Sequence, residues 1–158
     1  MKKIFSILMI AGIVALTNCS GQNKSIVKPD MLASAIEKRS LMIGKWLGEM
    51  KNEKGDLQQW LTTRFPDGTY KIQFRVPDRG SIYKEQIEAG LWGISGPIYF
   101  TIMKGWIKDN NFIPSNPNDP SYYDAYKIIE INKKILKYKS FESDITFEVK
   151  KVDDDFEL

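Results

Sequence analysis

The feature that most constrains the fold is a stretch in which apolar and polar residues alternate without a break. Residues 70–76 read YKIQFRV, so every second side chain is apolar. A period of two places the apolar side chains on one face of a β-strand and the polar ones on the other. Turn-forming residues stand on both sides, PDGT at 66–69 and DRGS at 78–81. The segment is therefore expected to be one strand of an antiparallel sheet.

Short apolar segments of this kind recur from residue 43 to the C-terminus, each about 8–12 residues from the next. They predict about nine strands, at 43–50, 57–65, 70–76, 82–89, 91–94, 98–107, 122–131, 135–141 and 145–152. Residues 95–97 (SGP) predict a tight hairpin, and 108–121, with three prolines and four asparagines, is expected to be the one long loop. The regular spacing predicts an all-β fold, an antiparallel up-and-down β-barrel of about 8–10 strands, because closing the sheet removes its exposed edges.

A short helix is expected before the first strand. Pro29 and Asp30 are typical of a helix start, since an aspartate there can accept hydrogen bonds from free backbone amides. Apolar residues follow at near-helical spacing over 32–39. We expect a helix around 30–41 that covers one end of the fold.

The first 18 residues are expected to be a signal peptide rather than part of the fold. Two lysines at positions 2 and 3 precede an uncharged apolar run at 4–16, too short to span a bilayer and typical of a secretory signal. The run ends in LTNC at 16–19, which resembles the lipobox of bacterial lipoproteins. This resemblance implies that the Cys19 thiol receives a diacylglyceryl group. Ser20 in place of an aspartate implies the outer membrane, with the protein facing the periplasm.

The chain therefore divides into four parts: a lipoprotein signal peptide (1–18), a polar, lipid-anchored tether (19–28), a barrel with its leading helix (29–152) and an acidic tail (153–158). Residues 1–18 hold two lysines and no acidic residue, so the net charge of +3 falls to +1 without them. No basic stripe remains that would indicate binding to nucleic acid.

Composition argues against several kinds of site. With one cysteine and no histidine, the chain can form no internal disulfide, no catalytic pair that needs histidine and no histidine zinc site. Glu85 and Glu88 stand three apart in a strand, so they project to opposite faces rather than acting as paired carboxylates. Oxygen-bearing side chains gather at 108–124 without the pattern of a calcium loop. We expect no catalytic residue, cofactor or metal.

Several motifs together resemble the lipocalins and other calycins. GKW at 44–46 is similar to their Gly-x-Trp signature, and FPDGTY at 65–70 and GLWGI at 90–94 resemble hairpin and strand motifs of bacterial lipocalin-like lipoproteins. Residues 126–152 are similar to the last two hairpins of that family. The resemblance implies a barrel with a small apolar cavity, closed at one end by Trp46. It also implies a basic side chain stacked on that tryptophan, for which Lys150 and Lys151 are the candidates.

The candidate ligand-binding residues are mostly aromatic side chains of the expected strands, with two arginines. They are Trp60, Arg64, Tyr70, Phe74, Arg75, Trp92, Phe100, Tyr126 and Tyr138. These rings either pack a solid core or line a cavity. Trp60 shares its face of the strand with Thr62 and Arg64, so this polar face either lines a mixed cavity or exposes Trp60 to a partner.

The leading functional hypothesis is a non-catalytic, lipid-anchored envelope lipoprotein whose barrel binds or carries a small hydrophobic molecule or lipid. The alternative is a protein-interaction lipoprotein with a solid barrel core, which docks another envelope component through its surface or the 108–121 loop. An exposed Trp60 or Trp106 beside an apolar patch would favour the alternative. The volume of the barrel interior separates the two.

Overall fold

The computed structural model describes residues 29–77 and 83–158, and everything structural below refers to these residues. They form one α-helix, nine strands and a short 3-10 helix. In chain order the elements are α1 (Pro29–Met42), β1 (Gly44–Lys51), β2 (Leu57–Arg64), β3 (Thr69–Pro77), β4 (Tyr83–Ser95), β5 (Ile98–Lys108), β6 (Asn111–Pro114), η1 (Pro120–Tyr122), β7 (Tyr123–Ile131), β8 (Ile135–Ser140) and β9 (Thr146–Lys151). The predicted signal peptide, Cys19 and the tether lie outside the described residues.

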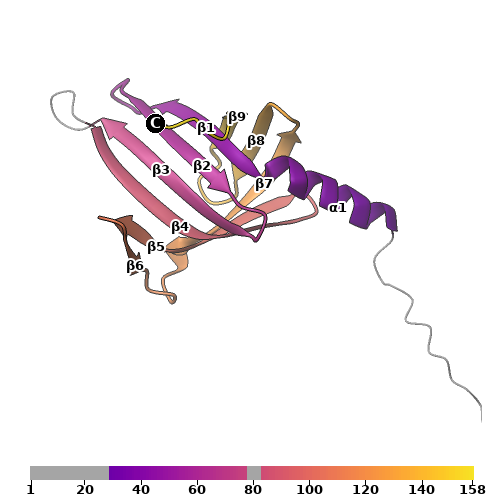
Figure 1. Cartoon of the computed structure of the whole chain (residues 1–158). Coiled ribbons are helices and arrows are strands. Elements are labelled where there is room, and N and C mark those ends of the chain that lie inside the picture. Colours follow the sequence, from indigo (N-terminus) through magenta and orange to yellow (C-terminus); the bar gives the residue numbers. More distant parts are fainter. Residues whose placement is uncertain (1–28, 78–82) are drawn as a thin grey trace, which may run out of the picture.

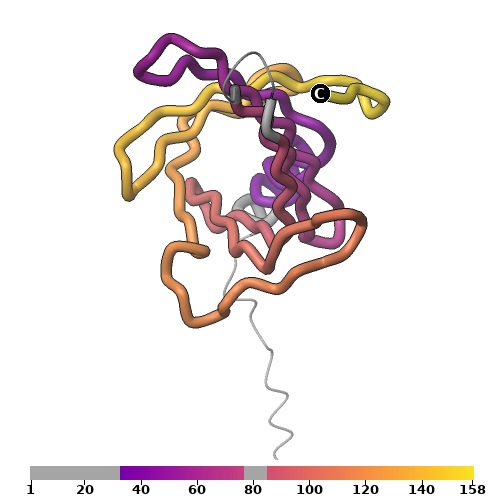
Figure 2. The backbone as a smooth tube through the Cα atoms, turned by 90° about the vertical axis from the view of Figure 1, so that its left-hand side faces the viewer, coloured from indigo at the N-terminus to yellow at the C-terminus, as the bar shows by residue number. Residues whose placement is uncertain are grey.

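The strands close into a barrel. Hydrogen-bonded neighbours run β4-β3-β2-β1-β9-β8-β7-β5, and β4 pairs again with β5, so eight of the described strands form a ring. Every neighbouring pair is antiparallel. Seen from the side (Figure 1) and turned by 90° (Figure 2), the strands surround a common interior. The prediction of an all-β, antiparallel up-and-down barrel of about 8–10 strands is confirmed.

Two details of the predicted strand pattern are wrong. The segments 82–89 and 91–94 are one strand, β4, which continues through Gly90 with a register shift against β5. A Cβ at Gly90 would lie 2.2 Å from the carbonyl oxygen of Ile102, so the glycine permits a close approach of two backbones instead of ending a strand. The expected loop at 108–121 contains the short strand β6, which pairs with the end of β5.

The helix sits at one end of the barrel, as the sequence predicts. Figure 1 shows α1 extending away from the strands, and its residues 33–37 are exposed. Its last turns are the anchored part: the Arg39 guanidinium donates to the Pro66 carbonyl at 3.1 Å and lies 4.5 Å from the centre of the Trp92 ring. Met42 is fully buried. We call this the closed end of the barrel.

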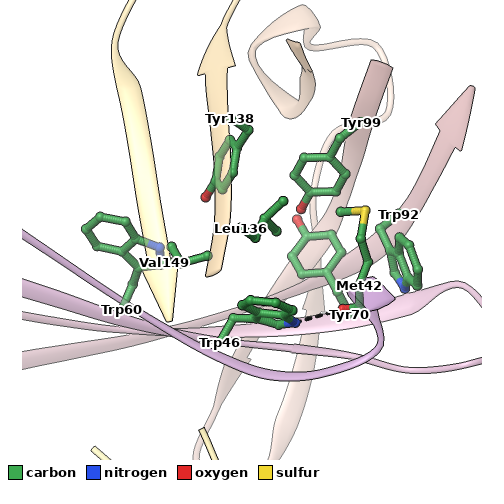
Figure 3. Packing of buried hydrophobic residues seen from close by; sticks show 9 residues of the cluster. All are labelled: Met42, Trp46, Trp60, Tyr70, Trp92, Tyr99, Leu136, Tyr138 and Val149. Atoms are coloured by element: carbon green, nitrogen blue, oxygen red, sulfur yellow. Dashed lines mark hydrogen bonds between the residues drawn. The ribbon is translucent and has the colours of Figure 1, made fainter. Parts of the chain in front are cut away.

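The closed end is sealed around Trp46. This side chain is fully buried, and its indole N–H donates to the Met42 carbonyl at 2.9 Å (Figure 3). The Lys151 ammonium lies 4.7 Å from the centre of the Trp46 ring and donates to the Ile43 carbonyl. Of the two lysines that the sequence offers, Lys151 therefore stacks on the closing tryptophan.

The C-terminal residues fold back on the outside of the barrel. Asp153, Asp154 and Asp155 are exposed, whereas Phe156 is half-buried. The Lys45 ammonium donates to the Phe156 carbonyl at 2.8 Å, and the last three residues lie over the outer faces of β1, β2 and β3. The acidic segment is solvated, and the residues after it are packed.

Candidate functional site

A cavity occupies the half of the barrel that lies away from α1. Its volume is about 220 Å³. The lining is mostly apolar and aromatic, and it comes from β1, β2, β3, β7, β8 and β9. The lining residues are Met50, Gln58, Gln59, Trp60, Ile72, Phe74, Val76, Tyr126, Tyr138 and Phe147. We call this space the main cavity.

A smaller and more polar space adjoins the main cavity towards β4, β5 and β7. It has a volume of about 90 Å³ and shares four lining residues with the main cavity. Its lining residues are Thr62, Tyr70, Ile72, Phe74, Glu88, Tyr99, Thr101, Asp124, Tyr126 and Tyr138. We call it the inner chamber. The barrel interior thus has an apolar part and a polar part in contact with each other.

The aromatic wall is held by ring-to-ring packing. The Tyr138 ring stacks on Phe147 with centroids 5.4 Å apart and meets Tyr126 edge-on at 5.1 Å. Phe147 in turn meets Trp60 edge-on at 5.9 Å. Offset and edge-to-face pairs of this kind stabilise by about 0.5–1.5 kcal/mol each beyond the area they bury. These contacts between neighbouring rings fix the shape of the wall.

The Trp60 ring can lie where it does because residue 48, which faces it across the ladder, is a glycine. Gly48 lies directly opposite Trp60 in the β1–β2 ladder, and a Cβ at Gly48 would lie 2.1 Å from the indole ring. The ring lies flat over this position and is 8% exposed. The polar face of β2 is therefore the interior face, and Trp60 lines the cavity instead of facing a partner.

Arg64 is the charged group of the deep interior. It is 1% exposed, its Nε and Nη2 donate to the Tyr99 hydroxyl at 3.3 and 3.0 Å, and its Nη1 has no hydrogen-bond partner. The guanidinium also lies 4.7 Å from the centre of the Tyr99 ring. Arg64 lines neither the main cavity nor the inner chamber, because Tyr99 stands between it and the chamber.

Tyrosine hydroxyls supply neutral polar groups to the inner chamber. Those of Tyr70 and Tyr99 point towards each other in Figure 3. Burial raises the pKa of Tyr70, Tyr126 and Tyr138, so these hydroxyls stay protonated at physiological pH. They can donate to a ligand or accept from it without carrying charge.

Two carboxyl groups also line the inner chamber. Glu88 accepts from the Gln86 amide at 2.7 Å, and Asp124 accepts from the Thr101 hydroxyl at 3.3 Å. Burial is the main cause that raises the pKa of both groups. The charge of Asp124 raises the pKa of Glu88 further. Within the described residues, no other carboxyl group lines either space.

The structure brings together part of the predicted ligand set. Trp60, Phe74, Tyr126 and Tyr138 line the main cavity, and Tyr70 lines the inner chamber.

Four other predicted residues lie elsewhere. Arg64 is buried behind Tyr99, and Trp92 packs beneath Arg39 at the closed end, with its indole N–H donating to the Phe65 carbonyl at 3.1 Å. Arg75 and Phe100 belong to the predicted ligand set, but both project from the outer face of the barrel. Arg75 pairs there with Glu85 at 3.1 Å, and the Phe100 ring covers Gly93.

Sequence reasoning missed Glu88, Asp124, Tyr99 and Phe147 as lining residues. Asp124 alternates with Tyr126 in β7, and the predicted strand 122–131 held both, so strand parity could have placed Asp124 inside. Glu88 shares its parity with Trp92 in β4, but the predicted break between 82–89 and 91–94 separated the two residues. Within the described residues, no group of three or more acidic or cysteine side chains could hold a metal ion.

The architecture is lipocalin-like. Eight antiparallel strands in up-and-down order close into a barrel, with a leading helix and a tryptophan under a basic side chain of the last strand at one end. No helix within residues 29–77 and 83–158 has the length and apolar character needed to cross a membrane.

No family model matches the chain, and no curated protein is significantly similar to it. Among solved structures, it is similar to a lipocalin-like protein from Bacteroides uniformis, with a TM-score of 0.47, 14% identity, and coverage of 71% of this chain and 99% of that one. It is also similar to an uncharacterized protein from Bacteroides eggerthii, with a TM-score of 0.41, 13% identity, and coverage of 70% and 98%. The assignment of the barrel rests on the strand pairings of this chain itself.

Proposed function

We propose that this protein is a non-catalytic binding protein that holds a small hydrophobic molecule in its main cavity. The observation that supports the proposal is the cavity of about 220 Å³ with a wall of mutually packed aromatic rings. A cavity of roughly 150 Å³ suffices for benzene. The main cavity therefore suits a molecule somewhat larger than one aromatic ring, and a long acyl chain would have to extend beyond it.

The same cavity separates the two functional hypotheses. A protein-interaction lipoprotein with a solid barrel core has no need of an interior space, and Trp60, which an exposed docking surface would use, lies inside the barrel. Trp106 is half-buried and meets Tyr122 edge-on at 5.8 Å. These placements favour the ligand-binding hypothesis.

Membrane anchoring through Cys19 belongs to the same proposal. It is supported by the apolar run at 4–16 and by the LTNC motif that ends in the only cysteine. In the described part, α1 meets the barrel at the closed end, and the main cavity lies in the half of the barrel away from α1. A lipoprotein of the outer membrane would thereby present its cavity to the periplasm.

A binding titration tests the ligand-binding proposal. 2-Phenylethanol, an uncharged molecule with one ring, is titrated into the purified protein by calorimetry. Ile72→Phe fills the interior and should abolish binding, whereas Ile102→Phe adds the same volume on the outer face and should leave binding intact. Equal binding by both variants would overturn the proposal, as would failure of the wild type to bind both this alcohol and its amine counterpart, 2-phenylethylamine.

Mass spectrometry of the protein extracted from membranes tests the anchor. The expected N-terminal peptide begins at Cys19 and carries the mass of the attached acyl chains. An N-terminal peptide with a free Cys19 thiol would refute lipid anchoring and leave the binding proposal untouched.

A further inference from the structure

The inner chamber has two carboxyl groups on its lining and no basic side chain beside them. Glu88 and Asp124 both line it, and neither the chamber nor the main cavity has a lysine or arginine on its lining. The ion pairs found in the described residues join other side chains: Arg75 with Glu85, Lys137 with Glu148, and Lys139 with Asp144. The two interior carboxyls are therefore balanced by no cation of the lining.

The hydrogen bonds of these carboxyls come from neutral groups. Their donors are the Gln86 amide for Glu88 and the Thr101 hydroxyl for Asp124. No basic side chain is among the causes that shift the pKa of either carboxyl, whereas burial raises the pKa of both. Both carboxyls are half-buried, and desolvation of a carboxylate without a cationic partner costs free energy, which either a proton or a cationic ligand reduces.

Arg64 does not fill this role. Its guanidinium donates to the Tyr99 hydroxyl and lies outside the lining of the chamber. Its charge acts on the pKa of the Tyr70 and Tyr138 hydroxyls, whereas it is not among the causes that shift the pKa of Glu88 or Asp124. The groups that a ligand can reach are thus two carboxyls, tyrosine hydroxyls and aromatic faces.

Aromatic faces around a pair of carboxyls are the surroundings that an organic cation prefers. Tyr70, Tyr126 and Tyr138 line the chamber together with the carboxyls, and Phe74 and Tyr126 continue into the main cavity. A cation over an aromatic face is attracted by the negative face of the ring, more strongly when the cation is desolvated. The chamber volume of about 90 Å³ suits an ammonium group, and the main cavity suits the apolar body attached to it.

From these observations we infer that the ligand is a small organic amine whose ammonium group binds in the inner chamber between Glu88 and Asp124, with its apolar body in the main cavity. This inference rests on the proposed function, since it names the ligand class of the same interior space. The site would then select among hydrophobic molecules of similar size by their charge.

Three probes of similar size and different charge test the inference on the wild-type protein. 2-Phenylethylamine is protonated at neutral pH, 2-phenylethanol is neutral and phenylacetate is negative. An ammonium beside carboxylates in a partly buried site should bind at least about tenfold more tightly than the alcohol. Phenylacetate should bind more weakly than the alcohol. Calorimetry at neutral pH measures all three.

Two variants locate the effect. Glu88→Gln combined with Asp124→Asn removes the interior charge with little change of volume, so the affinity for the amine should fall to that for the alcohol. The ratio of the two affinities in this variant, compared with the ratio in the wild type, is the readout. Glu85→Gln removes one negative charge on the outer face of the same strand and should leave the preference for the amine intact.

The outcomes separate this inference from the proposed function. Equal affinity for amine and alcohol, or tighter binding of phenylacetate, overturns the inference while the cavity proposal stands. Failure of all three probes to bind overturns both. The comparison of probes on the wild type decides the matter even where the double variant does not fold.

Discussion

The two halves of the barrel interior are packed differently. At the closed end, Met42, Trp46 and Leu136 have no exposed surface, and the side chains fill the space between α1 and the strands. In the half away from α1, Phe74, Tyr126 and Phe147 are only half-buried and border an open volume of about 220 Å³. Both halves use aromatic rings. A densely packed end can therefore stabilise the barrel while the other half keeps room for a ligand.

The largest expected effect tests whether the closed end is the stabilising half. Trp46→Ala should lower the free energy of unfolding by about 4 kcal/mol, because it removes a fully buried indole and opens a cavity in dense packing. Trp60→Ala should cost less, about 2 kcal/mol, since Trp60 already borders an empty space. Urea unfolding followed by circular dichroism measures both values. A larger loss for Trp60→Ala would contradict the comparison.

A second substitution should fill part of the open half of the interior. Gly48→Ala places a methyl group 2.1 Å from the present position of the Trp60 ring, so the ring must move towards the cavity. We expect a loss of about 1–3 kcal/mol in the free energy of unfolding, as for other overpacked interiors. Binding of 2-phenylethanol should weaken as well, because the displaced ring occupies the ligand volume.

The control for this substitution is Gly55→Ala in the β1–β2 turn, where a Cβ meets nothing within 4 Å. It carries a positive φ of 86°, so it costs some stability, but it should leave ligand affinity unchanged. Titration calorimetry on both variants checks the contrast. Unchanged affinity in Gly48→Ala would show that Trp60 does not define the cavity wall.

A third prediction concerns the pH dependence that the inner chamber gives to stability. Because the pKa values of Glu88 and Asp124 are raised in the folded protein, the folded state holds protons that the unfolded chain releases. The free energy of unfolding should therefore decline as the pH rises from about 4 through the folded pKa values. The double variant Glu88→Gln, Asp124→Asn should flatten this decline. Urea unfolding over a pH series measures it, and Glu85→Gln serves as the control that retains the slope.

The smallest effect is expected on the outer face. Arg75→Ala removes an ion pair with Glu85 in which both side chains are partly exposed, 27% and 47%. Such pairs contribute about 0–1 kcal/mol, so the free energy of unfolding should change little. The affinity for 2-phenylethanol should equal that of the wild type, because Arg75 does not reach the interior. A clear loss of affinity would show that Arg75 contributes to ligand binding.

Strand parity explains how far the ligand site could be predicted. It placed Tyr70 and Phe74 on one face of their strand, and that face is the interior. It could not by itself say which face of β5 turns inward, so Phe100 was assigned to the lining in place of its neighbour Tyr99. The two faces of β5 are both rich in apolar residues, and only closure of the barrel distinguishes them.

Local periodicity, turn residues and spacing along the chain were enough to predict the antiparallel barrel and the leading helix, and the resemblance of GKW at 44–46 to the Gly-x-Trp signature implied the closing role of Trp46. Only the tertiary structure decided that Lys151 covers Trp46, that the polar face of β2 is internal, and that Glu88 and Asp124 share one chamber. Lys151 and Trp46 lie far apart in sequence, as do Glu88 and Asp124. Their meeting depends on the register between strands and on the shift at Gly90, which no local pattern encodes.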